Sequence, residues 1–203
     1  MTDLEIITAE LQLRDRDRWL ACLYAPASAR AGLIALFVLD LELAQLVITT
    51  TDPMIGEIRL AWWRERLEEL DEGKAPAQPL LAALLAHALP VLAGSDLAAI
   101  EDRWLGMIGH DSVTDAHVAG GGVLFALAAR LLGGDAAHAD ALGRAWVLGE
   151  PPLAATPAPL RLLRGLANLG VRDAAWARAG RPTEPRGSLA RQWVLLKAVA
   201  LGR

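Results

Sequence analysis

Short runs of helix-forming residues, separated by glycine and proline, make up almost the whole chain. Alanine and leucine are the dominant residue types, whereas aromatic residues make up only 5% and β-branched residues are few. Because alanine and leucine are strong helix formers, this composition favours helices over strands. The sequence therefore predicts an all-α fold.

Prolines, glycines and capping residues divide the chain into predicted helices. A helix that begins near Asp3 should end before Pro26, because a proline disfavours helical geometry in the preceding residue. Asp52 is placed to cap a helix that begins at Pro53, and Gly73 should end that helix. The predicted helices are 3–25, 28–48, 53–72, 78–93, 95–109, 111–132, 136–148, 158–169, 172–179 and 188–201.

One domain over residues 1–203 is the organisation we expect. The length of 203 residues is usual for a single domain, and no repeat of fixed period divides the chain. Residues 150–159, EPPLAATPAP, hold too many prolines for a helix interior and should form an extended crossing. Residues 149–203 are expected to be a looser and more divergent part, in which Ser188 caps the last helix as Ser95 caps an earlier one.

Charge and apolar content restrict the classes of partner. The 24 acidic and 20 basic residues leave a formal charge of -4, with no basic stripe for nucleic acid and no polybasic cluster for anionic lipids. The single cysteine, Cys22, lies in an apolar run, which suits a reducing cytoplasm. Neither a secretory signal nor a membrane span is predicted, since Asp40 and Glu42 interrupt the longest apolar run. The apolar content of 54% leaves peripheral contact with the inner membrane open.

The segment GEIRLAWWRERLEEL, residues 56–70, places two adjacent tryptophans among many charged residues. Helical spacing gives two neighbouring apolar rows, Ile55, Ile58 and Trp62 in the first and Leu60, Trp63, Leu67 and Leu70 in the second. We expect this broad face to pack in the core, as aromatic residues at helical spacing usually do. The alternative is that one tryptophan lines a cavity with Arg59 or Arg64 at its rim, which would suit an apolar ligand with an anionic head.

Asp40 and Glu42 are the only charged residues in the apolar run LIALFVLDLELAQLVI, residues 33–48. Two residues apart on a helix, their side chains point about 200° away from each other, so they do not share a metal ion as an i, i+4 pair can. We expect structural ion pairs with Arg59 or Arg64, and a catalytic role is the alternative.

Two further patterns favour structural roles. Four potential metal ligands occur within eight residues, namely His110, Asp111, Asp115 and His117. We expect capping there rather than metal binding, because Asp111 is placed to cap a helix and Asp115 lies in its first turn.

The glycines at 120–122 lack the strand and the Lys-Ser/Thr pair of a phosphate loop, and they predict close helix packing.

The order of several motifs resembles that of the squalene/phytoene synthase family. An Arg-Trp pair at Arg18 precedes Ala-Pro, Arg30, a long helix with an acid, and then GEIRLAWWR from Gly56 to Arg64. The similarity extends over about residues 14–150. It implies an all-α, isoprenoid-synthase-like helix bundle around a central cavity. Active members of the family join two prenyl diphosphates and hold Mg²⁺ with two aspartate-rich motifs on facing helices.

Both metal-binding motifs are incomplete in this chain. Asp40 and Glu42 stand alone where the first motif is expected, and prolines follow Glu150 where the second should continue. In this respect the sequence resembles the branch that includes mitochondrial complex I assembly factors. That resemblance implies a protein without metal-dependent catalysis, which either binds an isoprenoid-like lipid or assists the assembly of a membrane enzyme.

Each reading has its own candidate residues. For the binding protein they are Arg30, Arg59, Trp63 and Arg64, with Arg30 closing the cavity entrance, and no cofactor or metal is expected. The alternative is a Mg²⁺-dependent prenyltransferase of isoprenoid biosynthesis. Its catalytic candidates are Asp40, Glu42 and Glu150, with Asp111 and Asp115 as further ligands.

Overall fold

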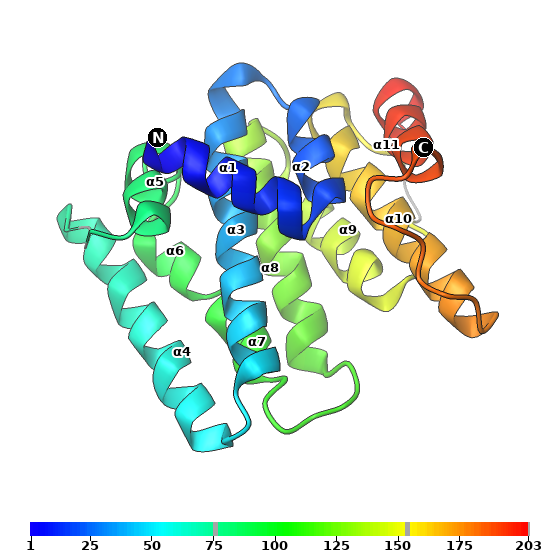
Figure 1. Cartoon of the computed structure of the whole chain (residues 1–203). Helices are drawn as coiled ribbons and strands as arrows, with labels where there is room; N and C mark the ends of the chain where they lie inside the picture. The colour runs from blue at the N-terminus through cyan, green and yellow to red at the C-terminus, as the bar shows by residue number, and fades with distance from the viewer. Residues whose placement is uncertain (75–76, 153–154, 203) are drawn as a thin grey trace.

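Helices are the only regular secondary structure in residues 1–74, 77–152 and 155–202, the part of the chain described by this computed structural model (Figure 1). The α-helices are α1 (Asp3–Arg14), α2 (Arg16–Leu23), α3 (Ala27–Thr49), α4 (Pro53–Glu68), α5 (Pro79–His87), α6 (Gly94–Ala98), α7 (Glu101–Leu105), α8 (Asp115–Leu132), α9 (Ala136–Leu148), α10 (Arg161–Arg178) and α11 (Leu189–Leu201). The 3-10 helix η1 (Glu69–Glu72) extends α4, and η2 (Ala158–Leu160) precedes α10. The predicted all-α fold is confirmed.

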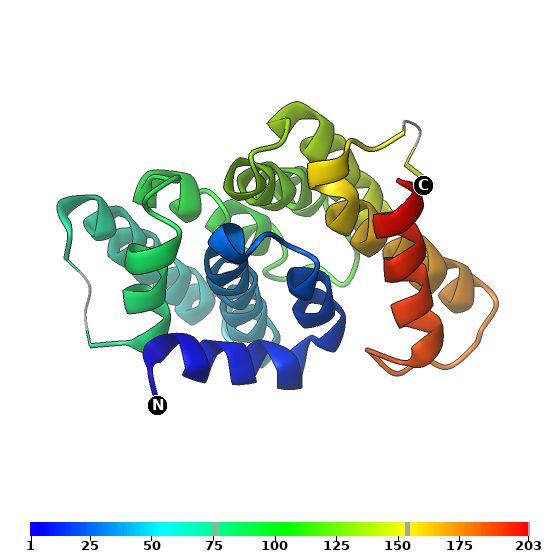
Figure 2. The same cartoon turned by 90° about the horizontal axis from the view of Figure 1, so that it is seen from above.

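Helix α3 organises the core. It contacts α1, α2, α4, α5, α7 and α8, and its buried side chains include Leu33, Leu36, Phe37, Leu39 and Leu43. Burying one such side chain contributes about 1.5–3 kcal/mol. Helices α9, α10 and α11 follow one another outward from α8, so that α4 and α11 lie at opposite edges of the molecule in both views (Figures 1 and 2).

Two helices, α3 and α8, have the length and hydropathy of membrane spans. Both are core helices in this fold. In the most apolar 18-residue window, 67% of α3 and 56% of α8 is buried inside the protein. Their hydropathy is therefore accounted for by packing against other helices.

The first two predicted helices differ from expectation at one acidic residue. Asp15 adopts φ -141° and ψ 82°, which ends α1, so the predicted helix 3–25 is two helices. The Asp15 side chain accepts a hydrogen bond from the backbone N–H of Arg18 and caps α2. The caps predicted at Asp52 and Ser188 and the end at Gly73, with φ +73°, are confirmed.

Other helix ends also differ from the predicted ones, each for a local reason. Thr114, rather than Asp111, caps α8, and Asp111 lies exposed in the preceding loop. The cap of α6 is Ala93, whose N–H is bound by the Asp96 side chain, so the predicted cap at Ser95 is wrong. The helices predicted at 158–169 and 172–179 form one helix, α10, in which Gly170 allows a close approach to α9 rather than a break.

Only one of the two predicted apolar rows of α4 is in the core. Leu60, Trp63, Leu67 and Leu70 are buried, as predicted. Ile55, Ile58 and Trp62 are exposed, at 51%, 63% and 46%, because α4 lies at the edge of the bundle. The two adjacent tryptophans thus divide between interior and surface, with their rings edge to face at 5.4 Å.

Glycine permits α8 and α9 to pack closely. A Cβ added at Gly143 of α9 would meet the backbone carbonyl of Gly121 in α8, and one at Gly121 would meet the Val147 side chain. The close packing predicted for the glycines at 120–122 is therefore confirmed. Alanine at Gly143 would force the two backbones apart.

We expect Gly143→Ala to destabilise the fold by about 1–3 kcal/mol, the usual cost of overpacking a core contact. Urea unfolding followed by circular dichroism measures this. Gly56→Ala is the matched control, since its Cβ would lie 3.1 Å from the flexible Ile108 end and it improves helix propensity. Equal losses of stability in both variants would contradict this account of the α8–α9 contact.

Candidate functional site

Five helices bring polar and aromatic side chains together in the interior next to α3. Arg18 comes from α2, Asp40 from α3, Arg103 and Trp104 from α7, His117 from α8 and Trp146 from α9. We call these six residues the polar centre. Asp40, Arg18, Arg103 and His117 are all buried.

Asp40 is the anion at the middle of the polar centre. Its Oδ2 accepts a hydrogen bond from Arg18 Nη1 at 2.8 Å, and its Oδ1 accepts from Arg103 Nη1 and Trp104 Nε1, both at 2.9 Å. Burial by itself raises the pKa of Asp40, but the charges of Arg103 and Arg18 and these hydrogen bonds hold the pKa below its usual value. Asp40 is therefore a fully buried carboxylate with three of about four acceptor positions occupied.

The two guanidinium groups also contact the Trp146 ring. The Cζ atoms of Arg18 and Arg103 each lie 5.0 Å from the centroid of that ring, and Phe125 stacks on it at 5.2 Å. Arg18 has a second carboxylate partner in buried Asp15, at 3.2 Å. The two buried cations are thus matched by two buried anions and by an aromatic face, which offsets part of the cost of removing them from water.

His117 continues the network from Arg103. Its Nε2 lies 3.2 Å from Arg103 Nη2 and its Nδ1 lies 3.4 Å from the Arg103 carbonyl oxygen. A neutral ring with the proton on Nδ1 satisfies both contacts, since Nδ1–H donates and Nε2 accepts. Burial and then the charge of Arg103 lower the pKa of His117 from 6.5 to about 4, so the ring is neutral at pH 7.

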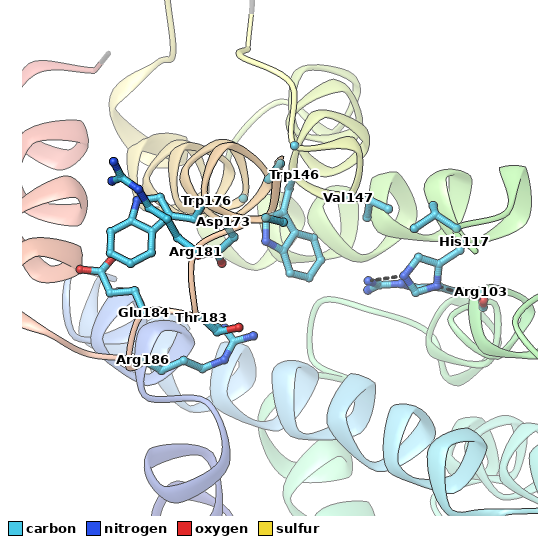
Figure 3. Close-up of a pocket in the computed structure, with 15 residues that line it drawn as sticks. Arg103, His117, Trp146, Val147, Asp173, Trp176, Arg181, Thr183, Glu184 and Arg186 are labelled. Atoms are coloured by element: carbon cyan, nitrogen blue, oxygen red, sulfur yellow. Dashed lines mark hydrogen bonds between the residues drawn. The ribbon is translucent and has the colours of Figure 1, made fainter. Parts of the chain in front are cut away.

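A cavity of about 490 Å³ opens beside the polar centre, between α9, α10 and residues 179–187 (Figure 3). Arg103, His117 and Trp146 lie at one end, and Trp176, Arg181 and Arg186 at the other (Figure 3). Two acids also line it, but Asp173 is paired with Arg191 and Glu184 with Arg172. The cavity thus offers aromatic surface and cationic groups.

The acids proposed as Mg²⁺ ligands do not come together. Glu42 points away from Asp40 and pairs with Arg14, as the 200° separation predicted, while Glu150 is exposed. Asp111 and Asp115 are exposed as well. Among the described residues, no group of three or more His, Cys, Asp or Glu side chains could hold a metal ion. A dication at Asp40 would also meet two guanidinium groups, so these residues do not fit the metal cluster of active family members.

The predicted ion pairs of α4 are wrong. Arg64 binds Glu101 and Asp102 of α7, the latter at 2.6 Å, and Arg59 donates to Thr50 Oγ1 at 3.2 Å. Neither reaches Asp40 or Glu42, because α4 turns these side chains away from the polar centre.

The proposed ligand-binding residues lie away from the cavity. Arg30 donates to the carbonyl oxygens of Cys22, Leu23 and Ala25 and so closes the end of α2 rather than an entrance. None of Arg30, Arg59, Trp63 and Arg64 is among the residues that line the cavity beside the polar centre. Their roles in binding remain predictions.

The partners of Asp40 were missed from the sequence. Arg18 comes from α2, and Arg103 and Trp104 come from α7, so their convergence on Asp40 depends on how helices far apart in the chain pack. The local sequence offers no signal, because Arg18 follows the charged run RDRD and Arg103 follows Glu101 and Asp102, so neither looks like the partner of a buried acid.

We expect Asp40→Asn to lower the free energy of unfolding by about 3–5 kcal/mol, because it leaves Arg18 and Arg103 buried without a full counter-charge. Glu42→Gln on the same helix, partly exposed and paired with Arg14, should cost about 1 kcal/mol or less. Chemical denaturation of both variants provides the comparison. Similar small losses for the two acids would show that Asp40 does not hold the centre together.

The depressed pKa of His117 predicts a pH dependence of stability. The unfolded chain takes up the His117 proton near pH 6.5 and the folded chain only near pH 4. Stability is therefore present above pH 6.5 and is lost as the pH falls from 6.5 to 4, by about 1–3 kcal/mol. In His117→Gln this part of the slope should disappear, and an unchanged slope would assign it to other groups.

Comparisons with known proteins agree with the resemblance seen in the sequence. The sequence model of the family described as squalene/phytoene synthase matches residues 11–90. The proteins named "NADH dehydrogenase (ubiquinone) complex I, assembly factor 6" of Bos taurus and Homo sapiens are 30% and 31% identical to the chain over 74 residues. That match covers 36% of this chain and 22% of each relative. No solved structure gives a significant match. The resemblance to the squalene/phytoene synthase family is confirmed over residues 11–90, and the resemblance to complex I assembly factor relatives over 74 residues.

Proposed function

We propose that this squalene/phytoene synthase-like protein is not a prenyltransferase and that it assists the assembly of a membrane enzyme. The observation that carries the first part is that buried Asp40 already accepts hydrogen bonds from Arg18, Arg103 and Trp104. Asp40 and Glu42 stand where the resemblance places the first metal-binding motif of active members.

The polar centre argues against diphosphate ionisation on energetic grounds. Metal catalysis of this kind needs carboxylates that are free to bind Mg²⁺, which then stabilises the departing pyrophosphate. Freeing Asp40 would separate it from two buried cations, and breaking such a pair costs about 3–5 kcal/mol. The other acids are too scattered to replace it, since Glu42 is held by Arg14 and Glu150 lies on the surface.

The second part of the proposal rests on the relatives. Both curated relatives bear the name of a complex I assembly factor, and the chain matches 22% of their length. The squalene/phytoene synthase match lies in residues 11–90, which include Arg18 and Asp40. We infer that the chain acts by binding a protein partner, in the cytoplasm at the membrane.

The cavity supports a second candidate function, the binding of an isoprenoid-like lipid. A volume of about 490 Å³ lies within the usual range of ligand sites. Trp146 and Trp176 offer apolar walls, and Arg181 makes no ion pair with another described residue. Such a site suits an apolar chain with an anionic head, bound without chemical change.

Pyrophosphate release from farnesyl and geranylgeranyl diphosphate with Mg²⁺ tests the absence of catalysis. We expect no release above that of a protein-free blank, at any Mg²⁺ concentration, because Asp40 is not available to the metal. Mg²⁺-dependent release that is lost in Asp40→Asn or in Glu42→Gln would restore the prenyltransferase. Circular dichroism of each variant is needed, so that loss of folding is not taken for loss of catalysis.

The same samples report on lipid binding through tryptophan emission. A saturable change with farnesyl diphosphate, reduced in Trp176→Phe, would support the cavity as a ligand site. Trp62→Phe is the matched control, because Trp62 is exposed on α4 and does not line the cavity. Without an emission change, the assembly role remains and the lipid site is abandoned.

A further inference from the structure

Positive and negative charges are separated along the chain. Residues 158–203 carry nine Lys and Arg and two Asp and Glu, a formal charge of +7. Residues 1–157 carry eleven basic and 22 acidic residues, a formal charge of -11. The expectation that the chain has no cationic surface for anionic lipids was drawn from the total of -4, which conceals this asymmetry.

The outer side of α11 is apolar. Leu189 and Trp193 are exposed at 83% and 60%, and Leu196 and Leu201 are also exposed. Helical spacing places Leu189, Trp193 and Leu196 on one side, opposite Leu195 and Ala198, which are buried against the bundle, whereas Leu201 lines the groove with α10. The sequence of α11, LARQWVLLKAVAL, contains no acidic residue, and Lys197 is exposed among these apolar side chains.

Basic residues accompany α11 along its length. Arg186 precedes its first turn, and Arg161 donates to the carbonyl oxygens of Val199 and Ala200 near its end. Between them, a groove of about 600 Å³ separates α10 from α11, with Arg172 and Lys197 beside Trp193, Val194 and Leu201.

The two acids of this region are already neutralised. Asp173 pairs with Arg191, and Glu184 pairs with Arg172 at 2.6 Å. These pairs also neutralise Arg172 and Arg191, and Arg186 pairs with Asp15 and Asp17 at 3.5 and 3.4 Å, so the positive charge of this surface comes from Lys197 and Arg161. The surface formed by the outer side of α11 and its groove with α10 is therefore apolar, with a small positive charge. We call it the α11 face.

We infer that the α11 face docks on an anionic lipid bilayer, with α11 lying in the plane of the membrane interface. This inference rests on the proposed function, since it names the surface through which an assembly protein would reach its membrane. A helix with exposed tryptophan and leucine beside lysine and arginine is suited to the boundary between headgroups and acyl chains. Each basic residue near an anionic surface adds about 1 kcal/mol of attraction.

Charge selects the bilayer over a second copy of the chain. Two α11 faces brought together would place like charges opposite each other, which disfavours pairing. The exposed apolar row of α4 provides an internal comparison. Glu57, Glu65 and Glu68 lie on this helix together with Arg59 and Arg66, and residues 53–72 as a whole carry six acidic and three basic residues, a formal charge of -3. An anionic membrane should therefore attract the edge with α11 and repel the edge with α4.

Sedimentation of the full chain with vesicles tests the inference. One set contains phosphatidylcholine alone, and the other contains equal parts of phosphatidylcholine and phosphatidylglycerol. We expect binding to the anionic vesicles at least roughly tenfold tighter than to the neutral ones, decreasing as salt screens the charges. The double variant Trp193→Ser, Leu196→Asn should lose most of this binding, and Lys197→Glu should weaken it.

The matched control is Ile58→Asn, Trp62→Ser, which removes equally exposed apolar side chains from α4 and should leave vesicle binding unchanged. Thermal unfolding checks that all variants are folded. Equal binding to both vesicle types, no binding by the unchanged chain, or binding that is lost only in the α4 variant would each overturn the inference. None of these results bears on pyrophosphate release, so the two proposals fail separately.

Discussion

The contact between Asp40 and two arginines is the interaction on which the interior depends. A fully buried carboxylate is unstable without partners, and those partners come from α2 and α7, on either side of α3. Trp104 donates a hydrogen bond to Asp40, and the Trp146 ring contacts the guanidinium groups of Arg18 and Arg103. Because five helices contribute to it, this network ties the N-terminal helices to α8 and α9 and fixes how they are placed relative to one another.

Under the proposed function, the same network explains how a family resemblance can persist without the family chemistry. A buried acid on a central helix needs positive charge, which Mg²⁺ supplies in active squalene/phytoene synthases and arginine supplies here. Arginine binds carboxylates with directional N–H groups and stays charged at every physiological pH. Under our proposal, the helix bundle has kept the buried carboxylate of Asp40, and arginine side chains rather than Mg²⁺ balance its charge.

Local features were predictable from the sequence, whereas the site was not. Helix class, the caps at Asp52 and Ser188 and the inward row of α4 follow from propensity, capping chemistry and spacing within one segment. The partners of Asp40 lie 22 and 63 residues away, so no local pattern identifies them. The row with Ile55, Ile58 and Trp62 looked like core because spacing reveals an apolar row but not whether another helix covers it.

Helices α4 and α11 occupy opposite edges of the bundle and carry exposed apolar rows (Figures 1 and 2). Residues 53–72, around the first row, have a formal charge of -3, and residues 158–203, around the second, have one of +7. The two edges of the molecule therefore differ in charge, so the protein has a preferred orientation at a charged surface. An anionic surface would orient the protein before any contact forms, because it attracts the edge with α11 and repels the edge with α4. Once α11 is engaged, α4 faces the aqueous side and stays accessible, so the two edges can be used at the same time.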